Sequence, residues 1–226
     1  MMFMGAIRER SVMVIFLLFL PGCRGYINWG GCPWHHSERA IREIEEGHSF
    51  AKSVAIFDKY STRAIFDALP LADQVRAAYA RLVDEHYGKS EKWLPEEVAE
   101  QVALNEDRIS FYVLALREMP FGDQCGIWVP RLIFGDLTYA PIYIKRVDPP
   151  LEYKHILGAL YTRFKVIYEI AFNARDENSK PIIPVGARSV MLQFKSPDKE
   201  ASISWDFGAQ GITFGTADVD SLAEKE

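Results

Sequence analysis

The sequence predicts an α+β fold: a mainly antiparallel β-sandwich of the immunoglobulin-like kind, with an N-terminal helix and a helical hairpin insert. Short runs rich in β-branched and aromatic residues, divided by turn residues, fill the second half of the chain and predict about seven strands. Two neighbouring segments in the first half have helical periodicity instead. With 226 residues, 49% of them hydrophobic, the chain is long and apolar enough for one packed domain.

Three helices are expected in the first half of the chain. The first begins after Ser37, a good N-cap residue, and runs to about Phe57. The second covers 71–87 and ends at Gly88, which suits a left-handed C-terminal stop. The third covers 95–105, with proline in its first turn. The last two form a helical hairpin, an insert near 71–106 between the first and second strands.

The strands follow from β-branched and aromatic runs that turn residues bound. The predicted strands are 60–66, for which a helix fits almost as well, 109–116, 127–134, 138–147, 160–173, 187–195 and 201–207. Gly135-Asp136 and Ser196–Lys199 predict hairpins between the strands that they join. Alternation within 160–173 predicts one buried face and one face in water.

The charge balance excludes some partners. The chain has 26 Lys and Arg against 31 Asp and Glu, a net charge of −5, and no basic stripe stands out. A nucleic-acid partner is therefore not expected, and a mildly acidic surface would be repelled by anionic lipid headgroups.

The N-terminus has the parts of an export signal. Arg8 and Arg10 precede the apolar run 11–20, and small Gly22 stands directly before Cys23. The run is too short to span a bilayer as a helix. This pattern resembles the type II signal peptide and lipobox of bacterial lipoproteins, over residues 1–23 only. The alternatives are an ordinary secretory signal and an uncleaved anchor with a coincidental cysteine.

The resemblance implies a lipid anchor. In that family the cysteine thiol receives a diacylglyceryl group, the preceding peptide is removed and the new amine is acylated with a fatty acid such as palmitate, so Cys23 would become the first residue. Arg24 stands where the family often uses Asp to stay in the inner membrane. The expected location is the cell envelope, facing the periplasm, with the outer membrane favoured.

These features divide the chain into four parts: a signal peptide at 1–22, the lipidated cysteine and a Gly/Trp-rich tether at 23–36, one sandwich domain at 37–207, and a flexible acidic tail at 208–226. Cys32 and Cys125 are the two cysteines besides Cys23. Export would place both in an oxidising compartment, where thiols tend to pair. A disulfide between them and two unpaired thiols are both open.

Cys32, His35, His36 and Glu38 form the densest group of metal-ligand types in the sequence. They are weak metal candidates because no second ligand pair stands at a familiar zinc spacing. A solvated tether is the preferred interpretation of these residues, so the sequence predicts no metal and no other cofactor.

A cysteine nucleophile is the second chemical candidate. Cys125 lies in a turn-like segment, and His86 or His155 could serve as its base, although nothing in the sequence places either beside it. Motifs of serine hydrolases, zinc proteases and nucleotide-binding loops are absent from the sequence. No catalytic residue is assigned.

Aromatic residues gather around one predicted hairpin. Trp128, Tyr139 and Tyr143, with Arg131 beside them, are candidates for a partner-binding surface, since aromatic residues and arginine are enriched in interface hot spots. The favoured interpretation is that the aromatic residues belong to the sandwich core and its turns.

The function predicted from these features is a membrane-anchored, non-catalytic binding or assembly module of the cell envelope with a protein partner. The alternative is an envelope hydrolase or metal-dependent enzyme with an unidentified site; a third is a subunit of a larger secretion or surface apparatus. Convergence of His35, His36, Cys125 or His155 with carboxylates would favour the enzyme.

Overall fold

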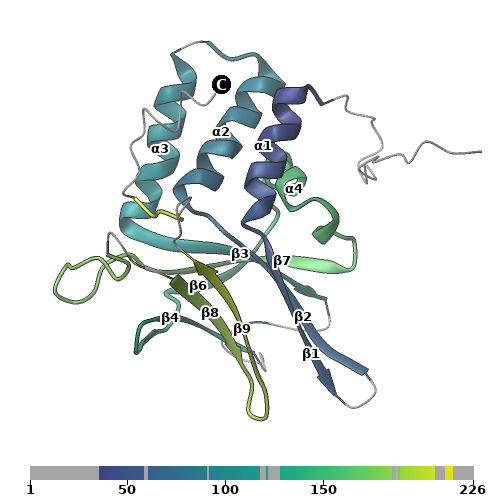
Figure 1. Ribbon diagram of the computed structural model, residues 1–226, viewed down its shortest axis with the longest axis vertical. Coiled ribbons are helices and arrows are strands. Elements are labelled where there is room, and N and C mark those ends of the chain that lie inside the picture. The colour runs from purple at the N-terminus through teal and green to yellow at the C-terminus, as the bar shows by residue number, and fades with distance from the viewer. Residues whose placement is uncertain are drawn as a thin grey trace, which may run out of the picture.

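The protein is built in three layers: helices, a five-stranded sheet and a four-stranded sheet (Figure 1). The five-stranded sheet lies between the helices and the smaller sheet, so it is covered on both faces. The computed structural model describes residues 36–58, 61–90, 92–117, 121, 128–184, 187, 189–206 and 212–215.

Both sheets are antiparallel throughout. The larger sheet contains, in spatial order, β1 (Lys52–Asp58), β2 (Ser61–Pro70), β3 (Arg108–Leu116), β7 (Lys165–Asn173) and β6 (Tyr143–Val147). The smaller sheet contains β5 (Leu137–Tyr139), β4 (Val129–Phe134), β8 (Ser189–Lys195) and β9 (Glu200–Asp206). The prediction of an α+β fold with antiparallel sheets is therefore confirmed.

Two predicted hairpins join strands of the smaller sheet. Gly135 adopts φ of 57°, which glycine reaches without a Cβ penalty, and the turn pairs Leu132 of β4 with Tyr139 of β5. The backbone N–H of Ser196 donates to the carbonyl of Lys199 over 2.7 Å and closes the β8–β9 turn. Both hairpins are confirmed.

The helices lie together on one face of the larger sheet, with α1, α2 and α3 side by side and α4 next to α1 (Figure 1). Their bounds are α1 (Glu38–Ser49), α2 (Asp73–Tyr87), α3 (Trp93–Asp107) and α4 (Leu151–Leu157), followed by the 3-10 turn η1 (Gly158–Leu160). The Ser37 side chain accepts the backbone N–H of Ala40 at 3.1 Å, which caps α1. Gly88 ends α2 in the left-handed conformation, as predicted.

Strand β3 shows how the sheet serves two cores. Phe111 and Val113 point into the core between the sheets, whereas Tyr112 and Leu114 point into the core beneath the helices. The alternation of side chains along a strand produces this division. A third, smaller cluster joins α2 to α3.

The predicted first helix is too long. Helix α1 ends at Ser49, and Lys52–Asp58 form β1, not helix. Val54 and Ile56 lie opposite Phe66 and Ala64 of β2, so apolar cross-strand pairing outweighs the local helical pattern. The uncertain strand at 60–66 exists as β2 and extends to Pro70.

Two of the predicted strand runs have different bounds. The run 138–147 is two strands in different sheets, with β5 pairing to β4 and β6 pairing to β7, because the proline at 141 interrupts it. The run 160–173 starts as a strand only at Lys165. The described residues thus contain nine strands where about seven were predicted.

The predicted wet face of 160–173 is wrong. Ile167 is 3% exposed, because the helices cover this face, and Ala171 is also buried. Helix α4, just before this strand, was not predicted: it follows Pro150, whose fixed φ favours a helix start, and it is only 7 residues long. Periodicity identifies so short a helix poorly.

Part of the predicted flexible tail is packed. Ile212 and Phe214 are buried in the core between the sheets. The carbonyl of Thr213 accepts the backbone N–H of Asp73, and the Asp73 carboxylate accepts the N–H of Gly215 at 2.8 Å. The apolar residues at 212 and 214 therefore attach this segment to the start of α2.

Candidate metal centre

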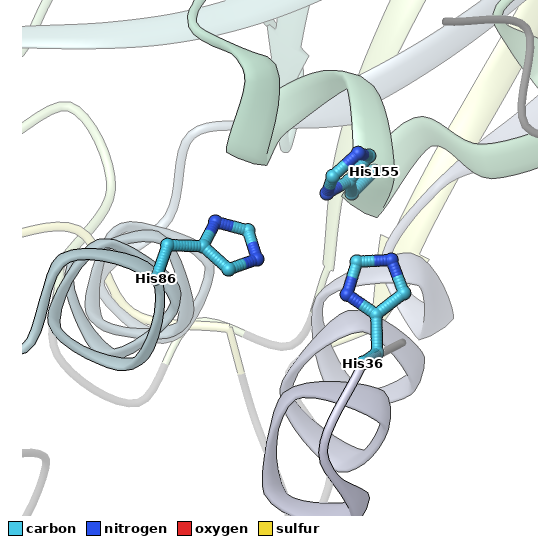
Figure 2. A group of neighbouring side chains, drawn as sticks. All are labelled: His36, His86 and His155. Carbon is cyan, nitrogen blue, oxygen red and sulfur yellow. The ribbon is translucent and has the colours of Figure 1, made fainter. Parts of the chain in front are cut away.

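Three histidines from three separate elements converge at one end of the helical layer. His36 directly precedes the N-cap of α1, His86 lies in the last turn of α2 and His155 lies on α4. One ring nitrogen of each residue lies within 4.8 Å of those of the other two. Figure 2 shows the three rings arranged around a common gap, approached by each residue from a different element.

The rings contact one another without stacking flat. The ring centroids of His36 and His155 are 4.8 Å apart at an interplanar angle of 80°. His86 and His155 are 5.7 Å apart at 88°, whereas His36 and His86 are 5.8 Å apart and tilted by 31°. One ring nitrogen of each histidine lies on the side of the shared gap (Figure 2).

The scaffold around the histidines is fixed by packing and by buried polar contacts. The guanidinium of Arg81 on α2 donates to Glu43 on α1 at 2.6 Å, and both side chains are buried. The rings of Tyr79 on α2 and Tyr153 on α4 stack with centroids 4.5 Å apart. His48, outside the group, lies on α1 with Nδ1 2.8 Å from the carbonyl oxygen of Ile156. All three helices are therefore tied to one another.

A buried carboxylate supports one histidine from behind. Nδ1 of His86 lies 3.2 Å from Oε1 of Glu152, and their side chains are 9% and 5% exposed. In the tautomer in which the Nδ1–H group donates a hydrogen bond to this carboxylate, Nε2 carries the free lone pair. Carboxylates placed in this way orient metal-binding histidines and raise their basicity.

The protein holds two of the rings neutral. Burial, and then the neighbouring His36 and His86, lower the pKa of His155 from 6.5 to about 4, with Glu152 opposing the change. Burial and the adjacent His86 also lower the pKa of His36. Neutral imidazoles have the free lone pair that a metal ion needs, so near pH 7 these two rings are ready ligands.

Nδ1 of His155 has no hydrogen-bond partner among the described residues, although the atom is buried. An unsatisfied buried polar atom costs about 1–3 kcal/mol. Native proteins seldom leave such atoms without compensation, and a bound group in or beside the cluster would provide it.

The spacing fits a transition-metal ion after small side-chain movements. Zinc binds histidine nitrogen at about 2.0–2.1 Å in tetrahedral geometry, which places the ligand atoms about 3.4 Å apart. Three nitrogens at most 4.8 Å apart lie at most about 2.8 Å from their common centre, and a spacing of about 3.4 Å puts them about 2.0 Å from it, so each nitrogen would move inward by at most about 0.8 Å. Small rotations of the imidazole side chains provide such a shift.

The sequence named all three histidines, but not as one group. His36 was a weak metal candidate, and His86 and His155 were alternative bases for Cys125. Glu38 is exposed in the first turn of α1 and is not a member of the group. Cys23, Cys32, His35 and Cys125 lie outside the described residues.

Sequence reasoning missed the role of Glu152. Glu152 and His155 stand three residues apart, one helical turn, which is a spacing that places a carboxylate near a ligand histidine. In the structure Glu152 contacts His86 of α2 instead of His155 of its own helix. Only the packing of α4 against α2 decides that pairing.

The candidate partner-binding residues differ in burial: Trp128 is buried, and the others are partly exposed. Trp128 is 8% exposed and belongs to the core between the sheets, and Tyr139 packs against that core. The hydroxyl of Tyr143 donates to Glu169 at 2.6 Å, and burial raises the pKa of Tyr143 to about 12. Arg131 is partly exposed on β4. Partner binding by this group stays a prediction.

Comparison with protein-family models, curated proteins and solved structures gives no match. Among the described residues, no helix is both long and apolar enough to cross a membrane. The histidine cluster and its surroundings are therefore the basis for any functional argument.

Proposed function

We propose that this protein is a lipid-anchored module of the bacterial cell envelope that binds a divalent transition-metal ion through His36, His86 and His155. The observation that carries the proposal is the convergence of three imidazole nitrogens from three elements within 4.8 Å. The sequence predicts a non-catalytic module without a metal, and it takes convergence of His36 or His155 with carboxylates as the sign of the metal-dependent alternative. His36 and His155 lie beside His86, which Glu152 contacts, so we propose a metal site in place of the metal-free module.

A metal ion explains the cluster better than ring packing alone. Aromatic packing would be served by phenylalanine, without the cost of burying nitrogens. Here burial and mutual proximity lower the pKa of His155 and of His36. A buried carboxylate also contacts His86 from behind. Together these features match the pattern of ligand and supporting carboxylate that metal centres use.

The ligand set favours a borderline ion such as zinc. Imidazole suits zinc, copper, iron and nickel, whereas calcium and magnesium take oxygen ligands. No carboxylate joins the three-histidine group among the described residues. Zinc is the natural first probe because it accepts three histidines without a redox change.

The membrane setting rests on the sequence. The lipobox resemblance at residues 1–23 supports acylation of Cys23, which lies 13 positions before His36. At about 3.5 Å per extended residue, that stretch limits the metal centre to within about 45 Å of the anchor. We further propose an envelope protein partner and an immunoglobulin-like sandwich, the latter supported by the core shared between two antiparallel sheets.

Zinc binding tests the proposal directly. Competition of the full chain with a chromophoric chelator should give one zinc per protein, and His86→Ala should weaken binding more than tenfold by removing one of three ligands. Glu38→Gln is the matched control, because Glu38 is an exposed carboxylate on α1 that lies outside the group. An equal loss of zinc affinity in the control variant, or no stoichiometric zinc binding by the wild type, would reject the site.

Glu152→Gln tests the supporting carboxylate separately. Loss of its charge behind His86 should lower zinc affinity by about 10–100-fold. The free energy of unfolding measured with a chelator present should change much less than the affinity, since Gln keeps an acceptor oxygen. A variant that loses stability but keeps its zinc affinity would assign Glu152 a structural role only.

Anchoring has its own test. Cells that express the protein are labelled with a fatty acid, and the same is done with Cys23→Ala. We expect label on the wild type and none on the variant; an unlabelled wild type would contradict the lipoprotein assignment without affecting the metal centre.

A further inference from the structure

We infer that a metal ion held by the three histidines keeps one coordination position for an exogenous ligand, a water molecule or a small anion. The inference rests on the proposed metal site and goes beyond it by assigning a ligand class. Structural zinc sites are closed by four protein ligands, whereas sites that act on small molecules have three and leave the fourth place open. The ligand count therefore separates these two kinds of site.

The described residues supply three ligands and no fourth. His36, His86 and His155 form a group of metal-ligand side chains that no aspartate, glutamate or cysteine of the described part joins. The Glu152 carboxylate lies against Nδ1 of His86. Its position is behind a ligand, where it orients the ring instead of coordinating the ion.

Among the described residues, the three ligands approach from different elements and no further side chain of a ligand type joins them. They come from the start of α1, the end of α2 and α4, so the ion would be approached by three rings from three sides (Figure 2). A tetrahedral ion with three such ligands directs its fourth position away from all of them. Each histidine remains partly exposed, so this end of the helical layer is not sealed in the core.

Charge favours an anionic ligand at that position. Three neutral imidazoles leave the full double charge on the ion, and the Glu152 carboxylate offsets only part of it. The site would have a net positive charge, which attracts small anions and lowers the pKa of a bound water to about 7. The ligand class is therefore water, hydroxide or a small anion, and not a bulky apolar molecule.

Cobalt substitution tests the inference, because Co²⁺ takes similar ligands and its visible absorption depends on coordination. The full chain is loaded with one equivalent of Co²⁺ and titrated with azide, and dialysis checks that the metal remains bound. We expect a saturable change in the visible spectrum on adding azide, with no response in His86→Ala. Cys32→Ser should give the same spectrum and the same azide response as the wild type.

Two results would overturn the open position while leaving the metal site intact. One is stoichiometric cobalt binding with no azide response. The other is a near-ultraviolet thiolate-to-cobalt absorption that Cys32→Ser removes, which would show a protein thiolate as the fourth ligand. Absence of cobalt binding by the wild type would instead reject the metal site itself, and the inference with it.

Discussion

The two faces of the five-stranded sheet bury different chemistry. The face toward the smaller sheet packs against aliphatic and aromatic side chains, with Phe66 at its centre, completely buried. The face toward the helices lies beneath a layer that also buries charged and titratable groups, among them Glu43, Arg81 and Glu152. The histidine cluster belongs to this second layer.

Side-chain alternation explains the apolar face. It directs every second residue of β2, β3 and β7 toward the smaller sheet, whichever strands are neighbours in the sequence. Helices α1, α2 and α4 come from distant parts of the chain, and specific polar contacts such as Arg81 to Glu43 fix how they meet. Side chains from three segments can then converge on one point. The sandwich layer therefore supplies stability, and the helical layer supplies the candidate site.

Phe66→Ala should give the largest loss of stability and no loss of zinc affinity in the folded protein. The ring centroid of Phe66 lies 4.4 Å from that of Phe194, on which it stacks, and 5.2 Å from that of Trp128. Removing the ring leaves a cavity and should lower the free energy of unfolding by about 3–5 kcal/mol. Urea unfolding with a chelator present measures the change. Phe57→Ala, at a residue 67% exposed on β1, is the control and should stay within about 0.5 kcal/mol. Similar losses of unfolding free energy in both variants would contradict the assignment of stability to the sandwich layer.

Glu43→Ala should destabilise the helical layer by about 3 kcal/mol, because it leaves the Arg81 guanidinium buried without its main carboxylate. Glu45→Ala, at an exposed position of the same helix, should stay within about 0.5 kcal/mol. The double variant Glu43→Leu with Arg81→Met should recover much of the lost unfolding free energy, because it leaves no unpaired buried charge. If the double variant is no more stable than Glu43→Ala, packing and not charge holds α1 to α2.

Ser37→Ala should cost about 1 kcal/mol, since it removes the side-chain cap of α1 next to His36. Zinc affinity should fall as well, because the start of α1 positions His36. Ser49→Ala at the other end of α1 removes an exposed contact to the carbonyl of Glu46 and serves as the control. Equal zinc affinity in both variants would show that the cap does not position the ligand.

Acid should destabilise the metal-free protein. The folded pKa of His155 is about 4 against 6.5 for an unperturbed histidine, so between these pH values the unfolded chain binds more protons than the folded one. Stability therefore rises with pH across this window and is lost as pH falls toward 4; the lowered pKa of His36 acts in the same direction. Unfolding in a chelator at pH 5 and pH 7 measures the difference, which should shrink in His155→Gln. An unchanged difference in that variant would show that other groups control the acid sensitivity.

Local patterns predicted much of the fold because local chemistry decides those features. The Ser37 cap, the Gly88 stop, the helical hairpin and two strand hairpins each depend on a few neighbouring residues. The end of α1 and the existence of β1 were mispredicted because pairing with β2 determines them. Likewise, the face of β7 that lies toward the helices was expected to face water. No local sequence signal indicates that helices from other parts of the chain cover it.

The sequence by itself determined the anchor resemblance, the α+β class and the residue types available for chemistry, since all three depend on composition and short-range spacing. The tertiary structure alone decided that His36, His86 and His155 meet and that Glu152 lies behind His86. The three histidines are separated from one another by tens of positions, and only the packing of α1, α2 and α4 against one sheet face brings them together. Convergence from distant segments leaves no periodic trace in a sequence.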